Sequence, residues 1–222
     1  MANNVVAFIG IDNFDNIIYL SRILTKLGKR VLILDHSETM SIRHSIPQPK
    51  GLNCDKEIIT YRQVDFATID FKENMKKEYD DILIYCGFHA LEKNIAHCNR
   101  LVYVTDLYRY NYIRMPKPSM VYGNDKPFEL GLLIKEATPI KITPEIISEN
   151  IGIPFSPENI SVLYHDEKDY ANSLICQYNG SYIFSKISKQ RKSYLMEEVR
   201  KLHPEIDSNR RKSAYRQAMR GG

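Results

Sequence analysis

The sequence predicts an α/β fold, a doubly wound and mainly parallel β-sheet with helices on both faces. Short apolar runs alternate with segments of helical length along most of the chain, which is the pattern of consecutive βα units. The run at residues 31–34 is an unbroken stretch of Val, Leu and Ile, which is typical of strands buried on both faces of a parallel sheet. Each crossover between parallel strands is expected to be right-handed.

The apolar runs place the strands. The first run leads into a loop that opens a helix, and the second run follows that helix directly. A short run after a polar, proline-containing stretch is a further strand candidate. The predicted strands are residues 5–9, 31–34, 58–61, 81–85, 101–105, 130–134 and 160–164.

Apolar spacing and end signals place the helices. Asp12 or Asn13 can cap the start of the first helix. The run Thr143-Pro144-Glu145 combines a capping threonine, a proline at the first helical position and an acid, which together predict another helix start. The predicted helices are residues 14–27, 71–79, 89–97, 108–115, 144–152 and 189–202.

The composition is that of a globular protein in a reducing compartment. Apolar residues make up 43% of the chain and charged residues 26%. No apolar run approaches the roughly 20 residues that span a bilayer, and the N-terminus lacks the pattern of a signal peptide. The 4 cysteines form no C-x-x-C pair, and the 6 histidines have no metal-ligand spacing. We therefore expect a cytoplasmic protein with reduced thiols and no metal site.

The net charge of +4 conceals an asymmetry between the body and the C-terminus. Residues 208–222 contain five basic residues and no acid, so the rest of the chain has 26 basic and 27 acidic residues. We predict one domain over residues 1–204 and a basic, flexible tail over residues 205–222. Such a tail could contact an acidic protein, a membrane surface or nucleic acid, and a solvated end without a partner is an equally good interpretation. Its basic residues are Arg210, Arg211, Lys212, Arg216 and Arg220.

Four segments resemble, in the same order, segments of the ParA/MinD family of deviant-Walker ATPases. Residues 27–35 (LGKRVLILD) resemble the segment LGKKVLLID that follows the family's P-loop helix, and residues 79–84 (YDDILI) resemble its Walker B strand. Residues 99–106 (NRLVYVTD) resemble a later strand, and residues 149–154 (ENIGIP) resemble the run before the final strand. The resemblance covers about residues 4–200 and implies a P-loop NTPase-like fold.

The residues at the family's phosphate-binding positions differ from its motif. Counted without gaps, the family's K-G-G-x-G-K-T falls on residues 8–14, where only Gly10 is kept. The resemblance places Asn13 at the Walker lysine and Phe14 at the magnesium-binding hydroxyl. Asp12 would bring a negative charge against the triphosphate, which at about 4 Å costs about 1 to 4 kcal/mol depending on the local dielectric.

Two acidic positions of the family's site also differ. Asp35 matches the first aspartate of the family's D-x-D pattern, but Ser37 replaces the second, which assists the attacking water. Tyr85 replaces the Walker B aspartate that supports magnesium. The resemblance therefore implies a degenerate nucleotide site at Gly10, Asp12, Asn13, Phe14, Asp35, Ser37 and Tyr85, with no catalytic residues and no cofactor.

Two other uses of the same sheet edge stay open. Asp35 lies 25 residues after Gly10 at the end of a strand, where an acid can bind a ribose hydroxyl, but the G-x-G-x-x-G pattern of dinucleotide-binding proteins is absent. Cys86 and His89 follow another strand and could line, with Asp35 and Ser37, the pocket of an enzyme or a ligand sensor. A buried cysteine and a histidine at a helix start are the simpler interpretation.

A cluster of tyrosines and arginines follows the fourth core strand. Aromatic residues beside arginines are enriched in protein interfaces and can also stack on bases. Because the body of the chain carries no net positive charge, we favour a protein interface over nucleic acid. The cluster consists of Tyr108, Arg109, Tyr110, Tyr112 and Arg114.

The expected function is that of a ParA/MinD-like pseudo-ATPase that acts as a scaffold or positioning protein. Members of this family position chromosomes, division sites, pili and secretion machines. The resemblance therefore implies protein partners in a bacterial membrane-associated assembly, such as pilus, secretion or conjugation machinery, which would hold the chain at the inner face of the membrane. A homodimer, or a heterodimer with a paralogue, is compatible with this expectation.

Overall fold

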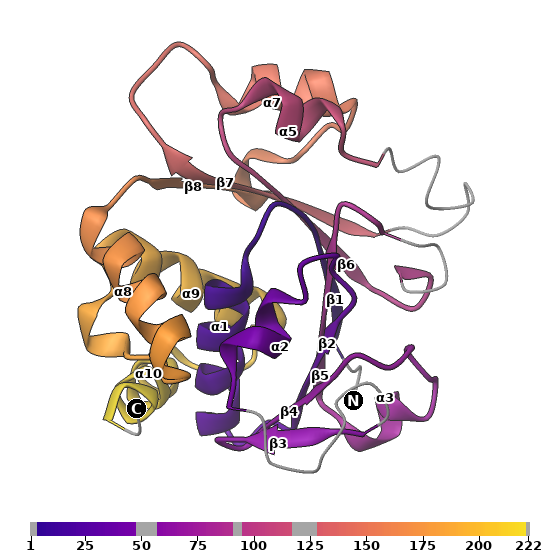
Figure 1. The fold of residues 1–222 in the computed structure, drawn as a ribbon, viewed down its shortest axis with the longest axis vertical. Coiled ribbons are helices and arrows are strands. Elements are labelled where there is room, and N and C mark those ends of the chain that lie inside the picture. Colours follow the sequence, from indigo (N-terminus) through magenta and orange to yellow (C-terminus); the bar gives the residue numbers. More distant parts are fainter. Residues whose placement is uncertain (1–3, 48–56, 91–94, 117–127, 221–222) are drawn as a thin grey trace.

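The chain folds into one sheet with helices packed on both of its faces (Figure 1). The computed structural model describes residues 4–47, 57–90, 95–116 and 128–220. The sheet has 8 strands in the order β3-β4-β2-β5-β1-β6-β7-β8, and only the β3–β4 pair is antiparallel. This arrangement confirms the predicted doubly wound α/β class. The strands are β1 (Asn4–Gly10), β2 (Val31–Asp35), β3 (Ile59–Tyr61), β4 (Val64–Ala67), β5 (Asp81–Gly87), β6 (Arg100–Thr105), β7 (Glu129–Ala137) and β8 (Ile160–Tyr164).

The helices divide between the two faces of the sheet. One apolar layer contains residues of α1, α2, α8, α9 and α10, and the other contains residues of α3, α5 and α7. No helix among the described residues is long and apolar enough to cross a membrane. The helices are α1 (Phe14–Lys26), α2 (Ser41–Ser45), α3 (Met75–Glu78), α5 (Arg109–Ile113), α7 (Pro144–Ile151), α8 (Glu167–Asn179), α9 (Lys189–Leu202) and α10 (Ser208–Arg220).

The central strand β1 contributes to both apolar layers. Val6 and Phe8 belong to the layer that contains α1, whereas Val5, Ala7 and Ile9 belong to the opposite layer. Each of these five side chains is at most 1% exposed. Because successive residues of a strand point to opposite faces, a strand covered on both sides must be apolar at every position. The apolar run of β1 is therefore unbroken because both of its faces are buried.

Several elements differ from the sequence-based expectation. The strand β4 and the helices α2, α8 and α10 were not predicted, while the predicted helices over 71–79 and 108–115 are shorter in the structure. The predicted helix over 89–97 lies partly outside the described residues. Strand β4 was missed because Arg62 and Gln63 form its turn with positive φ angles of 50° and 68°, positions that Asn and Gly normally fill in such hairpins.

The C-terminal segment is part of the domain, which corrects the expectation of a flexible tail over residues 205–222. Helix α10 packs against α1, with Ala214 2%, Tyr215 5% and Ala218 0% exposed. Arg22 of α1 also donates a hydrogen bond of 3.4 Å to the carbonyl of Ala218. The apolar face of α10 is narrow, but its two alanines let the backbone of α10 approach α1 closely. The helix therefore packs on the domain with few apolar side chains.

Replacing Tyr215 tests whether α10 is a structural element. We expect Tyr215→Ala to lower the free energy of unfolding by about 3 to 5 kcal/mol, because a large buried aromatic ring is removed and a cavity remains. Arg216→Ala, on the exposed side of the same helix, is the control and should change it by less than about 0.5 kcal/mol. Urea denaturation followed by circular dichroism measures both values. Two equally small effects would restore the flexible-tail interpretation.

Candidate functional site

The loop between β1 and α1 lies at the carboxyl edge of the parallel strands, where ligand sites of such sheets form. Gly10 ends β1 with a φ of 122°, and a Cβ atom added there would lie 2.1 Å from the carbonyl oxygen of Val104. The amide of Ile11 donates a hydrogen bond of 3.0 Å to the same carbonyl. Glycine is therefore required at position 10 by the close approach of β6, whether or not a ligand binds.

The carboxylate of Asp12 is held by three hydroxyl groups. Its Oδ1 accepts hydrogen bonds from Tyr85 at 2.7 Å, Thr39 at 3.0 Å and Ser41 at 3.1 Å. Burial, with Asp12 beside it, raises the pKa of the Tyr85 hydroxyl, so that this group stays protonated and donates. The three donors come from the end of β5 and from the segment around the start of α2. The three hydroxyls thus hold the negatively charged carboxylate of Asp12 in place at the surface of the loop.

Asp35 has a structural role at the start of α2. Its carboxylate accepts hydrogen bonds from the amide and the hydroxyl of Ser37, at 3.1 and 2.6 Å, and from the amides of Ile42 and Arg43, at 3.0 and 3.1 Å. Asp35 and Ser37 are each 3% exposed. The cavity beside Asp35 measures about 10 Å³, which is room for about one water molecule. Both carboxylate oxygens of Asp35 are therefore engaged by the segment around the start of α2.

Asn13 is buried and Phe14 is half-buried at the end of the loop. Asn13 is 0% exposed and precedes the first residue of α1, and its Oδ1 accepts a hydrogen bond of 2.8 Å from the side chain of Asn16. Phe14 is half-buried and packs against the apolar layer around α1. Both side chains therefore contribute to the packing of the helix start.

A lysine from β7 reaches the same loop, and the sequence analysis missed it. The ammonium of Lys135 donates a hydrogen bond of 2.8 Å to the carbonyl of Asp12 and lies 3.4 Å from the carboxylate of Asp15. The sheet register shifts between Ile134 and Ala137, and Glu136 has a φ of 51°. A bulge of this kind redirects the neighbouring side chain, which brings Lys135 to the loop. The available signal was a lysine that interrupts an apolar strand.

Asp15 links Lys135 to a second buried cation. Arg191 of α9 donates a hydrogen bond of 2.8 Å to Asp15, and the side chains of both residues are 4% exposed. Burial alone would raise the pKa of Asp15, but the two cations outweigh it and lower the pKa to about 2. Lys135 is therefore engaged by a fully ionised carboxylate and a carbonyl.

Cys86 and His89, the residues considered for an enzyme, are not arranged as a nucleophile and its base. Cys86 is 0% exposed, and burial raises the pKa of its thiol, which is opposite to the shift that activates a cysteine. His89 is exposed and pairs with Glu38. Among the described residues, no group of three or more His, Cys, Asp or Glu side chains is placed to hold a metal ion.

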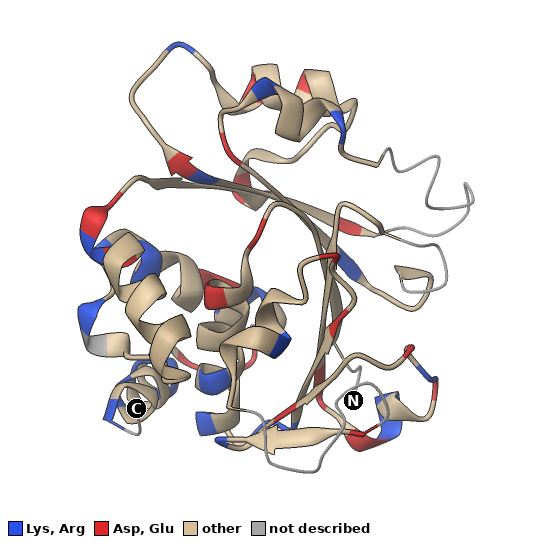
Figure 2. Ribbon diagram, viewed as in Figure 1, with Lys and Arg blue, Asp and Glu red and all other residues tan. Residues whose placement is uncertain are grey.

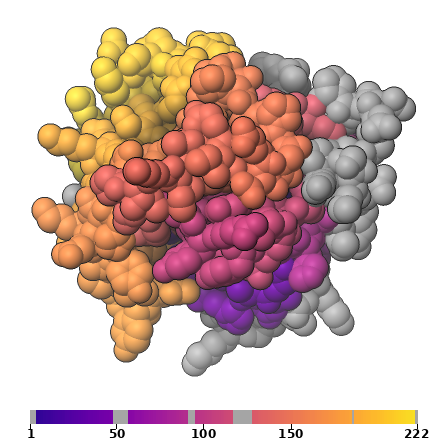
Figure 3. Space-filling model, turned by 90° about the horizontal axis from the view of Figure 1, so that it is seen from above, coloured from indigo at the N-terminus to yellow at the C-terminus, as the bar shows by residue number. Residues whose placement is uncertain are grey.

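The tyrosine cluster after β6 is only partly at the surface. Tyr108 and Tyr110 are 64% and 61% exposed, and their ring centroids are 5.6 Å apart. Tyr112 belongs to the core instead, because its side of the short helix α5 packs toward α7. Arg109 is exposed, and the guanidinium of Arg114 lies 3.6 Å from the ring centroid of Phe88. Figure 3 looks onto this face, where the segments of α5 and α7 lie side by side.

The fold is similar to those of several solved structures. A chain of the MinC:MinD cell division protein complex of Aquifex aeolicus matches with a TM-score of 0.64 and 12% identity, over 92% of this chain and 97% of that one. A ParA family ATPase from Chlorobium tepidum matches with a TM-score of 0.56 and 14% identity, over 98% of both chains. The pNOB8 ParA bound to nonspecific DNA matches with a TM-score of 0.59 and 14% identity, over 92% of this chain and 100% of that one.

The chain has the ParA/MinD fold. No protein-family profile and no curated protein sequence matches it significantly. At identities of 12–14% the structural likeness concerns the fold. The ParA/MinD fold, which the sequence analysis expected from four short segments, is therefore established by the arrangement of the elements, and the chemistry of the β1–α1 loop has to be argued from its own residues.

The contrast between Asp35 and Asp12 tests the structural role assigned to Asp35. Asp35→Ala leaves the amides of Ile42 and Arg43 without their acceptor, so we expect the free energy of unfolding to fall by about 2 to 4 kcal/mol. Asp12→Ala is the matched control. Because Asp12 itself is exposed, water can take the place of its carboxylate beside the three hydroxyls, so its loss should lower the value by less than about 1 kcal/mol. Similar losses for the two variants would contradict the assignment.

Proposed function

We propose that this chain is a non-catalytic protein with the ParA/MinD fold, which acts as a scaffold or positioning protein through protein contacts. The observation that carries the proposal is the fixed carboxylate of Asp12 in the loop between β1 and α1. In P-loop proteins this loop receives the phosphates of the nucleotide, with glycine amides and a lysine around them. The loop of this chain offers an acid and no lysine.

The residues of the loop do not fit a magnesium-bound nucleoside triphosphate. A phosphate beside α1 would meet the charge of Asp12, and the repulsion at about 4 Å is about 1 to 4 kcal/mol. Lys135 does not offset this charge, because its ammonium already binds a carbonyl and the carboxylate of Asp15. Tyr85, at the position that the resemblance assigns to the Walker B aspartate, has a neutral hydroxyl that cannot support magnesium as a carboxylate does.

A second observation supports protein contacts. Helix α8 buries polar side chains and exposes apolar ones: Asp169, Asn172 and Cys176 face the domain. The outward side chains follow the spacing i, i+4, i+5 and i+8, so they form one stripe, which we call the α8 stripe. Contiguous exposed apolar patches of this kind mark interaction surfaces. The stripe consists of Tyr170 (55% exposed), Leu174 (49%), Ile175 (44%) and Tyr178 (92%).

The setting of such a scaffold is inferred from the family resemblance, so it is part of the proposal. Proteins of this fold include one solved with its division partner MinC and one solved on nonspecific DNA. We assign this chain to a bacterial membrane-associated assembly, such as pilus, secretion or conjugation machinery, with protein partners that hold it at the membrane. A second copy or a paralogue of the chain is one such partner.

Nucleotide binding is the direct test of the catalytic part of the proposal. We expect ATP, ADP and NAD, with and without magnesium, to leave the melting temperature unchanged, because a ligand that binds the native state stabilises it by mass action. The MinD of Pyrococcus horikoshii, whose structure was solved in complex with Mg-ADP, is measured in parallel with ADP and magnesium as the positive control. A shift of several degrees with any of these nucleotides would refute the proposal and favour the alternative of an enzyme or ligand sensor at this sheet edge.

The α8 stripe provides the test of the scaffold part. Tyr170→Ser combined with Leu174→Ser and Tyr178→Ser should leave the unfolding free energy nearly unchanged, since all three side chains are exposed. The triple variant should lose the complexes that the wild-type chain forms in its source cells, as measured by co-purification. The control is Tyr108→Ser with Tyr110→Ser on the opposite side of the fold. Loss of complexes only in the control would move the interface to the α5 surface.

A further inference from the structure

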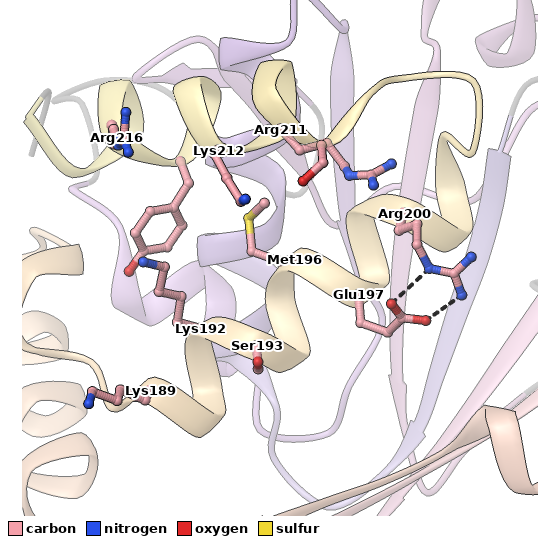
Figure 4. Close-up of a pocket in the computed structure, with 11 residues that line it drawn as sticks. Lys189, Lys192, Ser193, Met196, Glu197, Arg200, Arg211, Lys212 and Arg216 are labelled. Atoms are coloured by element: carbon pink, nitrogen blue, oxygen red, sulfur yellow. Dashed lines mark hydrogen bonds and ion pairs between the residues drawn. The ribbon is translucent and has the colours of Figure 1, made fainter.

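We propose that the groove between α9 and α10 binds an acidic segment of a partner protein. This inference adds the chemistry of a partner to the proposed scaffold role. It rests on that role in one respect, which is that the chain acts through contacts with other proteins. The groove has a volume of about 600 Å³ and is lined by side chains from both helices, which face each other across it (Figure 4). Its cationic lining residues are Lys189, Lys192, Arg200, Arg211, Lys212 and Arg216.

The positive charge of the groove is only slightly offset within the domain. Glu197 is the acidic residue of the lining, and Arg200 neutralises it through two hydrogen bonds of 2.8 and 2.5 Å. Within the described part of the chain, Lys189, Lys212 and Arg216 form no ion pair. With Glu197 paired to Arg200, the other five cationic residues of the lining give the groove a net positive charge, and it attracts an anionic partner.

The charge is local to this part of the chain. Residues 189–220 contain ten Lys and Arg residues against four Asp and Glu residues, whereas the rest of the chain contains 21 and 23. Figure 2 shows Lys and Arg gathered on α10 near the C-terminus. A long polyanion such as DNA would extend beyond the groove onto a surface without net positive charge. A short acidic segment is accommodated by the groove itself.

The floor of the groove also favours a peptide over nucleic acid. It contains Met196 and Tyr215, and a flexible methionine adapts to the apolar side chains of a partner. The ring of Tyr215 is unavailable for stacking on a base, because it is 5% exposed and Lys192 lies over it at 4.8 Å. Proteins that bind single strands rely on such stacking.

A second hollow adjoins the groove and reaches Ile175 of the α8 stripe. Lys189 lines the groove and also this second hollow of about 750 Å³ between α8 and α9, whose lining includes Ile175 and Ile187. Lys168 and Lys186 lie at this hollow as well. Apolar and cationic side chains are thus adjacent along one surface. A protein segment that combines acidic and apolar residues matches both, whereas a nucleic acid or a lipid headgroup matches the cations alone.

Binding of defined probes to the full chain tests the inference. The probe is a short fluorescent peptide of repeated Glu-Glu-Leu units, and its Gln-Gln-Leu counterpart is the neutral control. Fluorescence anisotropy should show saturable binding of the acidic peptide, which weakens as salt is added, and no binding of the neutral one. Single-stranded DNA, duplex DNA and vesicles with phosphatidylserine are measured in the same buffer. Tighter binding of DNA or of vesicles than of the peptide would overturn the inference.

Charge reversal locates the site. Lys192→Glu with Lys212→Glu and Arg216→Glu should weaken peptide binding by about tenfold or more, which corresponds to about 1.4 kcal/mol. The matched control changes the net charge equally at exposed lysines elsewhere, with Lys72→Glu, Lys77→Glu and Lys141→Glu, and should weaken binding by less than about twofold.

Equal weakening by the two sets of substitutions would show attraction by net charge alone and would refute a site in the groove. Circular dichroism verifies that both variants are folded. The result is independent of the nucleotide measurements. If the acidic peptide does not bind while ATP also fails to stabilise the chain, the groove inference is wrong and the non-catalytic assignment stands.

Discussion

The buried carboxylate of Asp15 joins the elements on which the rest of the structure depends. It lies in the first turn of α1, and it contacts Lys135 of β7 at 3.4 Å, Arg191 of α9 at 2.8 Å and Ser173 of α8 at 3.3 Å. Arg191 also lies 3.4 Å from Asp169 of α8. Removing one member of such a cluster is strongly destabilising, because it leaves a buried charge without its partner. The cluster therefore sets the positions of α1, α8 and α9 relative to the sheet.

This cluster accounts for the unusual orientation of α8. Asp169 and Ser173 must face inward to reach Arg191 and Asp15, and Asn172, on the same side, donates a hydrogen bond of 2.7 Å to Tyr19. With its polar side committed to the interior, the helix has to present its apolar residues to solvent. The same cluster binds the ammonium of Lys135 at the back of the β1–α1 loop. One set of buried charges thus causes α8 to expose its apolar stripe and also engages the lysine that lies beside the β1–α1 loop.

The sequence predicted the elements whose apolar residues are the buried ones, and it did not predict several elements in which the apolar pattern and the burial differ. The core strands are apolar at every position because both faces are covered, so their placement and the fold class followed directly. Helix α8 was not predicted although its apolar residues recur at helical spacing, and α10 was missed because its buried face is mostly alanine. At the site, Asp12, Asp35, Ser37 and Tyr85 were brought together by strand order. Lys135 was not, because its approach depends on a bulge at Glu136.

The exposed stripe and the basic groove lie on the same side of the sheet as α1, so unburied apolar surface and clustered positive charge occur on one side of the domain. Apolar side chains in water cost about 25 cal/mol per Å² of surface that could be buried, and clustered like charges on α9 and α10 add repulsion. A partner that supplies apolar and acidic side chains relieves both at once. Because the polar interior of α8 prevents the helix from turning its apolar side inward, the described part of the chain leaves the stripe exposed. The buried cluster at Asp15 therefore leaves an apolar stripe on the outer surface of this domain, where we propose that a partner binds.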